Sequence, residues 1–438
     1  MAGLVAAREL TRRGHLVTAL ESSERLGGQV STVRWHDRAV DTGAEAMFLG
    51  GPHVRQLLAE LDLIDDLVAP EPGSSWLSTK RGLTPLPAGV GPSGPSRLGP
   101  VLRSRLLTPT QLVRAGLEPL LARRRIDGDI AVGDFITRRF GRAVADTFVD
   151  PLLGNLHAGD IDRLSLLSTA PQLAPAAANG TSLVLRRTPR AAAPATGPAV
   201  PLFASFTSGL GTLITALAAG LTIHTGTPAR SARRTASGWQ VETDAATFEA
   251  DHLLIAAPAT VAAALLDSCV PGVGADLTAG RVADVATILL AYPAEAARTP
   301  ALRDGTGVML RSGTGRLLKA ATFLSRKWAH LAGDDLVLVR ASAGRVGADI
   351  LAPLDDATVA HRVHTDLAEL VELPMQPVDF LVTRWPGAYP QLEVGHAARL
   401  RGIRARLEDQ QVRLIGGPYD GLGIPSVVKS ALAGVDDL

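Results

Sequence analysis

The chain has 438 residues, of which 46% are apolar, and its formal net charge is +1. This length exceeds one ordinary hydrophobic core and predicts more than one domain. The nearly neutral charge argues against bulk electrostatic binding of nucleic acid, and the single cysteine, Cys269, excludes an intrachain disulfide and a CxxC site.

The first thirty residues have the pattern of the later part of a dinucleotide-binding βαβ unit. Gly3 fits a position where a helix packs closely on a strand, and Gly14 ends that helix. An apolar strand over residues 15–20 follows, as in a buried parallel sheet. Glu21 at its carboxyl end can accept hydrogen bonds from both ribose hydroxyls of an adenosine. A surface glutamate after any strand is the alternative.

The first strand and the first two glycines of the fingerprint G-x-G-x-x-G are absent. Because the first strand of a doubly wound sheet is central, its loss would leave strand edges unpaired. It would also remove the glycine turn that presents pyrophosphate to the helix N-terminus. We therefore expect the coding sequence to begin upstream of Met1, and we expect a chain that begins at Met1 to hold a flavin poorly.

A second motif follows the acid, over Arg25-Leu26-Gly27-Gly28-Gln29. Its two glycines let the backbone approach a phosphate or a flavin ring, although a plain turn is the alternative. The run from Glu21 to Gln29 resembles the second motif of the amine oxidase and protoporphyrinogen oxidase flavoprotein superfamily, which often has arginine where Gln29 stands. The resemblance implies that seven residues contact FAD: Gly3, Glu21, Ser22, Arg25, Gly27, Gly28 and Gln29.

A hairpin over residues 30–41 leads into Asp41-Thr42-Gly43-Ala44-Glu45-Ala46. The resemblance implies that Gly43, Ala44, Glu45 and Ala46 lie beside the flavin ring, whereas an ordinary glycine turn is the alternative. An amphipathic helix is expected over 54–67 and two short strands over 75–86.

Residues 106–125 carry apolar side chains at helical spacing beside basic ones. A buried face of a substrate domain is favoured over a membrane-surface role, and peripheral membrane contact stays open. No apolar run reaches the roughly 20 residues of a membrane span, and no signal peptide is recognised. We therefore expect a cytoplasmic protein.

Residues 148–165 are rich in proline and glycine and predict a turn-rich crossing between helices. They resemble a signature of the protoporphyrinogen and coproporphyrinogen oxidases, with Asp150-Pro151, then Gly154 to Asp160, then Leu164-Ser165. The family often has glycine where Asn155 stands and tyrosine where His157 stands. His157 is expected to be a hydrogen-bonded structural histidine, with a role as proton acceptor as the alternative.

The remaining segments alternate between the two expected domains. A flexible loop is predicted over 173–200, a strand and helix over 203–221, and strands over 222–255, where the resemblance implies that the Ala229 backbone lies near adenine. Strands between 283 and 341 predict a second sheet that floors a substrate cavity, and 358–373 predicts a helix. Arg384, Trp385 and Tyr389 are expected in a turn, with Trp385 beside the flavin or in the core. The resemblance implies flavin contacts from Leu422, Gly423 and Ile424, before a final helix.

The predicted fold class is α/β, with an interrupted doubly wound, Rossmann-like FAD-binding domain and a mixed α/β substrate domain. The FAD-binding domain is expected to comprise residues 1–70, 206–268 and 391–438. The substrate domain is expected to comprise residues 71–205, with a helical part, and 269–390, with the sheet.

The resemblance implies an oxygen-dependent flavin oxidase of haem biosynthesis that takes a porphyrinogen substrate and releases hydrogen peroxide. Coproporphyrinogen III is favoured, because the arginine- and alanine-rich composition indicates a GC-rich bacterium whose relatives use that route. The alternatives are a protoporphyrinogen IX oxidase, another flavin amine oxidase or desaturase, and a flavin-deficient porphyrin-binding remnant. No catalytic acid or base, no metal ligand and no oligomeric state are assigned.

Overall fold

The computed structural model describes residues 1–185 and 201–438, and these residues form two compact units. Unit 1 comprises Met1–Ala69, Pro201–Arg281 and His396–Leu438, and unit 2 comprises Pro70–Val200 and Val282–Gly395. Residues 186–200, which belong to the predicted flexible loop, lie outside the described residues. The first part of that predicted loop is instead helical, as α10 (Ala174–Asn179).

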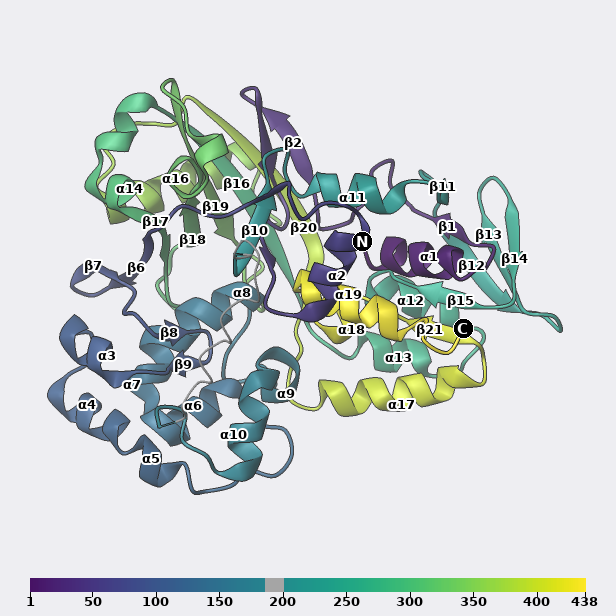
Figure 1. Cartoon of the computed structure of the whole chain (residues 1–438), viewed down its shortest axis with the longest axis horizontal. Coiled ribbons are helices and arrows are strands. Elements are labelled where there is room, and N and C mark those ends of the chain that lie inside the picture. The colour runs from purple at the N-terminus through teal and green to yellow at the C-terminus, as the bar shows by residue number, and fades with distance from the viewer. Residues whose placement is uncertain (186–200) are drawn as a thin grey trace. The chain divides into compact units, whose positions relative to one another are not determined.

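Unit 1 carries the amino-terminal and carboxyl-terminal segments of the chain (Figure 1). Its elements are α1 (Ala2–Arg12), β1 (Thr18–Leu20), β2 (Thr32–Trp35), β3 (Arg38–Asp41), β4 (Met47–Phe48), α2 (Pro52–Glu60), β5 (Leu67–Val68), β10 (Phe203–Phe206), α11 (Gly211–Ala218), β11 (Thr222–His224), β12 (Ala229–Arg234), β13 (Trp239–Thr243), β14 (Thr247–Ala250), β15 (Leu253–Ile255), α12 (Ala259–Leu266), α13 (Val273–Thr278), α17 (His396–Glu408), β21 (Val412–Leu414), α18 (Gly417–Asp420) and α19 (Ile424–Ala433).

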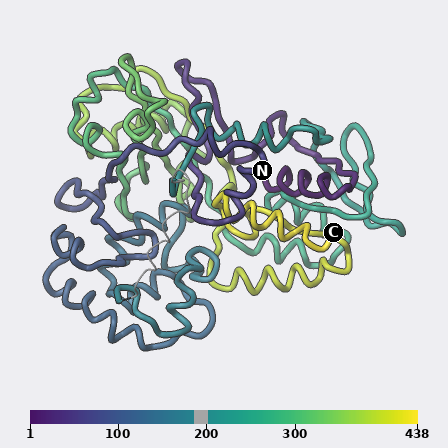
Figure 2. Tube along the Cα trace, in the orientation of Figure 1, coloured from purple at the N-terminus to yellow at the C-terminus, as the bar shows by residue number. Residues whose placement is uncertain are grey.

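The parallel strands of unit 1 form two pairs. β1 lies parallel to β11 with Thr18 opposite Thr222, and β15 lies parallel to β21 with Leu253 opposite Val412. Within the described residues these pairs are separate two-stranded sheets. Helix α1 packs against α11 and α19, so the first and last helices lie side by side (Figures 1 and 2). Parallel strands joined through helices give this unit the predicted α/β character.

Two apolar clusters stabilise unit 1. The first joins buried side chains of α1, α2, α11 and α19, and the second joins β12, β13, β15 and β21 with α12, α13 and α17. The second cluster explains why the predicted boundary at residue 269 is too early. Val273 and Leu277 of α13 are buried in it, so the chain leaves unit 1 only after Arg281.

Two predicted elements of unit 1 differ in the structure. The helix expected over 54–67 ends at Glu60, because Asp62 takes a left-handed conformation with a φ of 55° that a helix cannot continue. Within the strands expected over 222–255, the last part forms two separate strands, β14 and β15. The first completes an antiparallel sheet with β13, and the second pairs with β21.

Unit 2 combines one large sheet with a helical part (Figure 1). Its elements are β6 (Ser74–Thr79), β7 (Gly82–Pro85), β8 (Val90–Gly91), β9 (Gly94–Pro95), α3 (Leu98–Ser104), α4 (Pro109–Gly116), α5 (Glu118–Leu121), α6 (Val132–Phe140), α7 (Arg142–Val144), the π-helix η1 (Ala145–Gly154), α8 (Asn155–His157), α9 (Leu166–Thr169), η2 (Pro171–Leu173), α10, β16 (Val282–Pro293), η3 (Ala294–Arg298), α14 (Pro300–Asp304), β17 (Gly305–Met309), β18 (Leu318–Phe323), α15 (Leu324–Lys327), η4 (Ala329–Leu331), β19 (Leu336–Ala343), α16 (Asp356–Val371) and β20 (Asp379–Pro390).

The seven-stranded sheet of unit 2 has the order β20-β16-β19-β18-β17-β6-β7. Only β17 and β6 are parallel, so the sheet is mixed. Helix α16 covers one face, where Val359, Val363 and Leu367 pack with alternate side chains of β16, β18 and β19. Because side chains alternate along a strand, the other residues of these strands face the opposite side.

Two predicted turns of unit 2 are regular structure instead. Residues 145–154 form a π-helix that contains Pro151, and the wider π-helical turn accommodates a residue without an amide donor. Strand β20 continues through Trp385 and Tyr389 to Pro390 rather than ending in a turn. The pairing of β20 with β16 shifts register between Ala283 and Val285, which lie opposite Tyr389 and Trp385.

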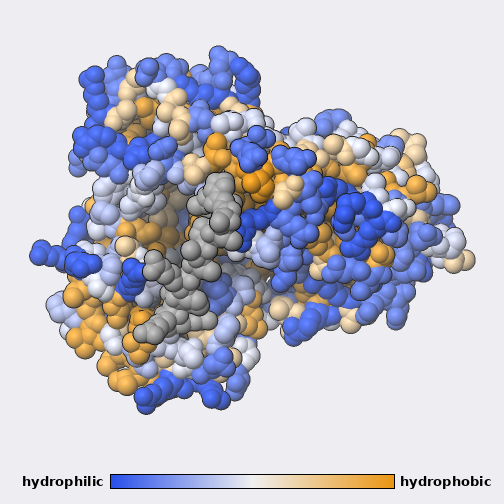
Figure 3. Space-filling model, viewed as in Figure 1, coloured by the Kyte–Doolittle hydropathy of each residue, from blue (hydrophilic) through white to orange (hydrophobic). Residues whose placement is uncertain are grey.

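The helical part of unit 2 is only partly covered. Ala115 and Ala122 are buried, whereas Val113 is 69% exposed and Leu120 is 62% exposed. The expectation of a buried face over residues 106–125 is therefore correct for one side of these helices and wrong for the other. Figure 3 shows apolar side chains at the surface in this region. Among the described residues, no helix is long and apolar enough to cross a membrane.

Candidate cofactor-binding site

Glu21 stands at the carboxyl end of β1, as the sequence predicts. Its amide donates to the carbonyl of His224 on β11 (2.9 Å), which extends the parallel pairing by one residue. One carboxylate oxygen, Oε1, accepts from the amide (2.9 Å) and hydroxyl (3.0 Å) of Ser23, and from the Ser22 hydroxyl at 3.4 Å. Within the described residues, Oε2 accepts no hydrogen bond. The carboxylate is therefore held in place with one oxygen available to a ligand hydroxyl.

The loop after Glu21 is held by its own arginine. The Arg25 guanidinium donates to the carbonyls of Leu26 (3.0 Å), Gly28 (2.7 Å) and Val30 (3.0 Å). Gly27 has a φ of 104°, and a Cβ there would lie 2.6 Å from the Val30 carbonyl oxygen. Arg25 and Gly27 thus shape a loop whose backbone is exposed at Gly28, a residue with open space on its Cα side.

The predicted flavin-contacting segments 27–29 and 43–46 are neighbours in space. The Ala44 amide donates to the carbonyl of Gln29 (2.9 Å), and a Cβ on Gly43 would collide with that same carbonyl oxygen. Thr42 donates from its amide to Ser31 (2.9 Å). Only glycine at position 43 allows the two backbones to approach so closely.

Asp41, which precedes this turn, organises the start of α11. Its carboxylate accepts from the amide of Leu210 (3.0 and 3.2 Å) and from the Thr32 hydroxyl (2.5 Å), which in turn accepts from the Gly211 amide (2.8 Å). This network is not among the features predicted from the sequence. An acid just before the Thr-Gly turn and a Gly-x-Gly at 209–211 are the signals that could have indicated it.

A second polar network fixes the carboxyl-terminal glycine turn. The Ser430 hydroxyl donates to Asp420 Oδ2 (2.5 Å) and accepts from the Gly416 amide (2.8 Å), while Arg404 pairs with Asp420 at 2.6 Å. Helix α19 begins directly after Gly423, so Leu422, Gly423 and Ile424 lie at its amino-terminal end. Such an end favours negative charge on a nearby ligand.

Two further residues of unit 1 that are predicted to contact FAD, Gly3 and Ala229, lie at the start of a helix and at the start of a strand. Gly3 is in the first turn of α1, with the Ala256 side chain in ordinary contact distance (3.4 Å) of a Cβ placed there. Ala229 begins β12 opposite Thr243. Trp385 belongs to unit 2, where its indole Nε1 donates to the Thr287 hydroxyl at 3.3 Å.

The signature segment lies within unit 2 and is mostly structural. Buried Asp150 accepts from the Ser312 amide (2.6 Å), and the Asn155 amide group donates to the carbonyls of Leu310 (2.9 Å) and Lys319 (3.0 Å). His157 is 7% exposed, and desolvation by burial lowers its pKa to about 4. The histidine is therefore neutral near pH 7. Its Nδ1 has no hydrogen-bond partner among the described residues, and Nε2 makes no hydrogen bond with them either. The histidine is therefore buried, but the expectation of a hydrogen-bonded ring is wrong.

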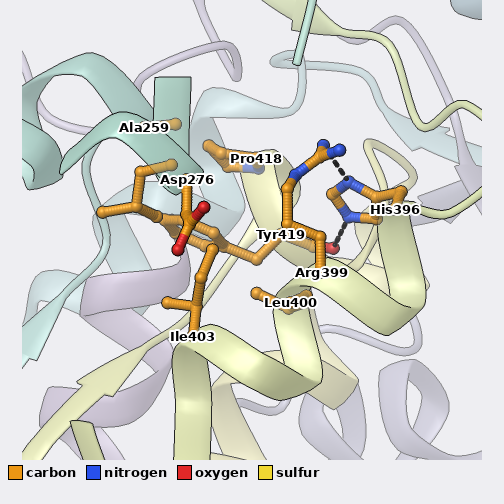
Figure 4. A pocket seen from close by; sticks show the side chains of 9 residues that line it. Ala259, Asp276, His396, Arg399, Leu400, Ile403, Pro418 and Tyr419 are labelled. Carbon is orange, nitrogen blue, oxygen red and sulfur yellow. Dashed lines mark hydrogen bonds between the residues drawn. The ribbon is translucent and has the colours of Figure 1, made fainter. Parts of the chain in front are cut away.

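A small pocket of about 20 Å³ lies elsewhere in unit 1 (Figure 4). His396 lies on its wall, 2.8 Å from the Tyr419 carbonyl oxygen through Nε2 and 3.4 Å from Arg399 through Nδ1. None of the residues predicted to contact FAD lines this pocket. Among the described residues, no cluster of three metal-ligating side chains occurs.

These features fit an adenine dinucleotide. A fixed carboxylate with one open oxygen suits a ribose, and glycine backbones at 27–28 and 43 allow close approach to the cofactor. The helix end at Gly423 suits the negative part of such a ligand. The sequence predicts these positions correctly as turns and strand ends.

Several known proteins are similar to this chain over nearly its whole length. The chain is 28% identical to the coproporphyrinogen III oxidase of Bacillus subtilis (strain 168), over 96% of this chain and 91% of that protein. It is 30% identical to the coproporphyrinogen III oxidase of Mycobacterium leprae (strain TN), over 100% and 96%. A crystal structure from Exiguobacterium sp. 255-15, provisionally assigned as a protoporphyrinogen oxidase, has a TM-score of 0.86 at 26% identity and covers 99% of this chain and 96% of that chain.

The fold also extends beyond these relatives. Cyclohexylamine oxidase from Brevibacterium oxydans shares it with a TM-score of 0.68 at 15% identity, over 99% of this chain and 95% of that chain. The family described as flavin containing amine oxidoreductase matches residues 1–438. The chain therefore belongs to the flavin containing amine oxidoreductase family, and it is an FAD-dependent oxidoreductase.

Proposed function

We propose that the protein oxidises coproporphyrinogen III to coproporphyrin III in haem biosynthesis. The observation that carries the proposal is the group of relatives named coproporphyrinogen III oxidase, which match 95–100% of this chain at 26–30% identity. The signature from Asp150 to Ser165 supports the same reaction. Its buried Asp150 and half-buried Asn155 fix the end of the π-helix against the loop before β18 and against β18 itself.

The reaction removes six electrons and six protons from the porphyrinogen. Bound FAD would supply a two-electron acceptor for hydride from the carbon framework, and oxygen would serve as the final oxidant and yield hydrogen peroxide. Three molecules of oxygen are therefore consumed for each porphyrin formed. Because aromatisation is strongly downhill, the residues of the chain mainly bind and orient the substrate, and we assign no catalytic acid or base.

We assign the cofactor to unit 1 residues by their geometry. Glu21 would bind the ribose through Oε2, and the backbones of Gly28, Gln29 and Gly43 would face the cofactor. Arg25 holds the loop through its three carbonyl contacts and is also a proposed contact of FAD. The other proposed contacts are Gly3, Ser22, Gly27, Ala44, Glu45, Ala46, Ala229, Leu422, Gly423, Ile424 and, from unit 2, Trp385.

Turnover of two porphyrinogens tests the proposed substrate. Coproporphyrinogen III carries four propionates and protoporphyrinogen IX carries two, so the FAD-loaded protein is offered each in turn while porphyrin fluorescence is followed. We expect a clearly higher kcat/KM for coproporphyrinogen III, and the opposite preference would reassign the substrate. Turnover of neither would favour another amine oxidase or desaturase, and a folded protein that cannot bind FAD would favour a non-catalytic remnant.

Peripheral contact with a membrane is a second part of the proposal. The exposed apolar residues Leu102, Val113 and Leu120 lie on α3, α4 and α5. Exposed arginines stand at 103 in α3 and at 105 and 123–125 in the segments that follow α3 and α5. Such a surface suits anionic lipid. We expect co-sedimentation with anionic vesicles, lost in the triple variant Leu102→Ser, Val113→Ser, Leu120→Ser. If the unchanged protein and the triple variant sediment with the vesicles to the same extent, the proposed membrane contact through these residues is wrong.

A further inference from the structure

The face of the seven-stranded sheet opposite α16 carries basic residues. Val337, Val339 and Ala341 of β19 pack with α16, so Arg340 between them faces the other side. Lys319 is the extra residue of a bulge in β18, because Leu318 pairs with Ala343 and the next paired residue, Ala320, faces Ser342. Bulges commonly redirect a side chain toward a functional site.

Lys319 is a buried cation without an anion. The residue is 5% exposed, and its Nζ lies 5.3 Å from the centre of the Tyr389 ring. The ammonium has no hydrogen bond or ion pair with any other residue of the described ranges. Burial, followed by the charges of Arg345 and Arg340, lowers the pKa of Lys319 to about 7. A buried ammonium with only an aromatic ring beside it is costly unless an anion joins it.

Arg345 completes the cluster from the segment after β19. Its Nη2 donates to Asn155 Oδ1 and to the Leu310 carbonyl (3.3 Å), while its buried Nη1 has no partner among the described residues. Asp150 lies near this guanidinium, and burial raises the pKa of its carboxyl group. Lys319 and Arg345 therefore have one carboxyl group, that of Asp150, near them, and these three groups carry an excess of positive charge.

We propose that Lys319 and Arg345 form a carboxylate-binding site that takes one propionate side chain of the tetrapyrrole. The proposal rests on the proposed function and deepens it by naming the residues that recognise the substrate's acid groups. An ammonium and an unpartnered guanidinium N–H supply charge-assisted hydrogen bonds to the two oxygens of one carboxylate. The Tyr389 ring beside Lys319 supplies an apolar wall for the rest of the side chain.

The test compares coproporphyrin III with its tetramethyl ester, which has the same ring and no carboxylate. Affinities are measured by quenching of porphyrin fluorescence with the full-length FAD-loaded protein and with Lys319→Met, Lys319→Arg and Lys80→Met. Lys80 is an exposed lysine in the β6–β7 turn and serves as the matched control. We expect Lys319→Met to weaken binding of the free acid at least about tenfold, with the ester unaffected and with Lys319→Arg and Lys80→Met close to the unchanged protein.

Steady-state oxidation of coproporphyrinogen III by the same proteins separates this proposal from the proposed function. We expect Lys319→Met to raise KM roughly tenfold with little change in kcat. If the unchanged protein oxidises the substrate and Lys319→Met keeps its KM and its affinity for the free acid, the carboxylate site is wrong and the function stands. Equal weakening of acid and ester would also overturn the site, because it would indicate general damage to the sheet face. If the unchanged protein neither binds nor oxidises porphyrins, both proposals fail.

Discussion

At the scale of single residues, the buried titratable groups of unit 2 give the clearest predictions. His157 is buried, and its pKa of about 4 lies below the usual value near 6.5. Between these two values the unfolded chain binds a proton that the folded protein does not, so the free energy of unfolding falls as the pH is lowered. The loss amounts to roughly 3 kcal/mol at most.

Substitution of this histidine tests that statement. We expect His157→Phe to remove the histidine's share of the stability loss between about pH 6.5 and about pH 4, as measured by urea unfolding at several pH values. His15→Asn, in an exposed turn, is the control and should follow the unchanged protein. An unaltered acid profile in His157→Phe would contradict the account.

Lys319 gives a prediction of the same sign in a higher pH range, because folding lowers its pKa as well. Its folded pKa of about 7 lies below the value near 10.5 of an unfolded lysine, so the unfolded chain binds more protons between these values and stability rises with pH there. We expect Lys319→Met to be more stable than the unchanged protein at pH 7, by up to roughly 4 kcal/mol, with the difference closing toward pH 10. Equilibrium unfolding measures it, and a less stable Lys319→Met at pH 7 would sink the idea.

The sequence identifies some site residues and not others for a physical reason. Glu21, Gly27 and Gly43 are recognisable because a strand end or a close backbone approach demands that residue type. The role of Arg25 is not recognisable, because the carbonyls that its long side chain reaches depend on the path of the folded loop. The cluster around Lys319 and Arg345 escapes notice for the same reason, since it joins residues from separate strands and loops.

At the scale of elements, the contact between the 27–30 loop and the 42–44 turn is the critical one. Gly43→Ala would force its Cβ into the Gln29 carbonyl and separate the two segments. We expect purified Gly43→Ala to hold less than about a tenth as much FAD as the unchanged protein, read from flavin absorbance. Gly51→Ala, at the start of α2 with no atom within 4 Å of the new Cβ, should retain its FAD. Full flavin content in Gly43→Ala would refute the role of this contact.

The carboxyl-terminal network gives a second prediction at this scale. Ser430→Ala leaves the buried Gly416 amide without its acceptor and Asp420 without one donor. We expect a loss of about 1–3 kcal/mol in stability and weaker FAD binding. Ser426→Ala, in the same helix but without a hydrogen bond of its side chain among the described residues, should change neither. Equal behaviour of the two variants would show that the network has no special role.

Helices and strands were predictable where the spacing of apolar residues and the length of the segment indicate the same element. The hairpin β2–β3, helices α1, α11 and α16, and the strands of the large sheet follow their expected residues closely. The π-helix at 145–154 and the continuation of β20 through Pro386 were not predictable, because proline and glycine normally interrupt such elements. Side chains of neighbouring strands replace backbone hydrogen bonds that these elements lack. Asp284 Oδ1, for example, accepts from the Gly387 amide (2.6 Å).

At the scale of the whole molecule, the chain divides into two units that each gather separate segments. Unit 1 contains the residues assigned to FAD, apart from Trp385, and unit 2 contains the signature segment and the basic sheet face. This division explains why one sequence carries both a dinucleotide motif and a porphyrinogen oxidase signature. We therefore expect a porphyrinogen to reduce FAD bound to this chain.

Anaerobic mixing of the FAD-loaded protein with coproporphyrinogen III tests that claim most directly. The account predicts that the absorbance of oxidised flavin near 450 nm, about the usual wavelength of this cofactor, bleaches as coproporphyrin appears, and that admission of oxygen restores it. A flavin that stays oxidised in the presence of coproporphyrinogen III would contradict the account.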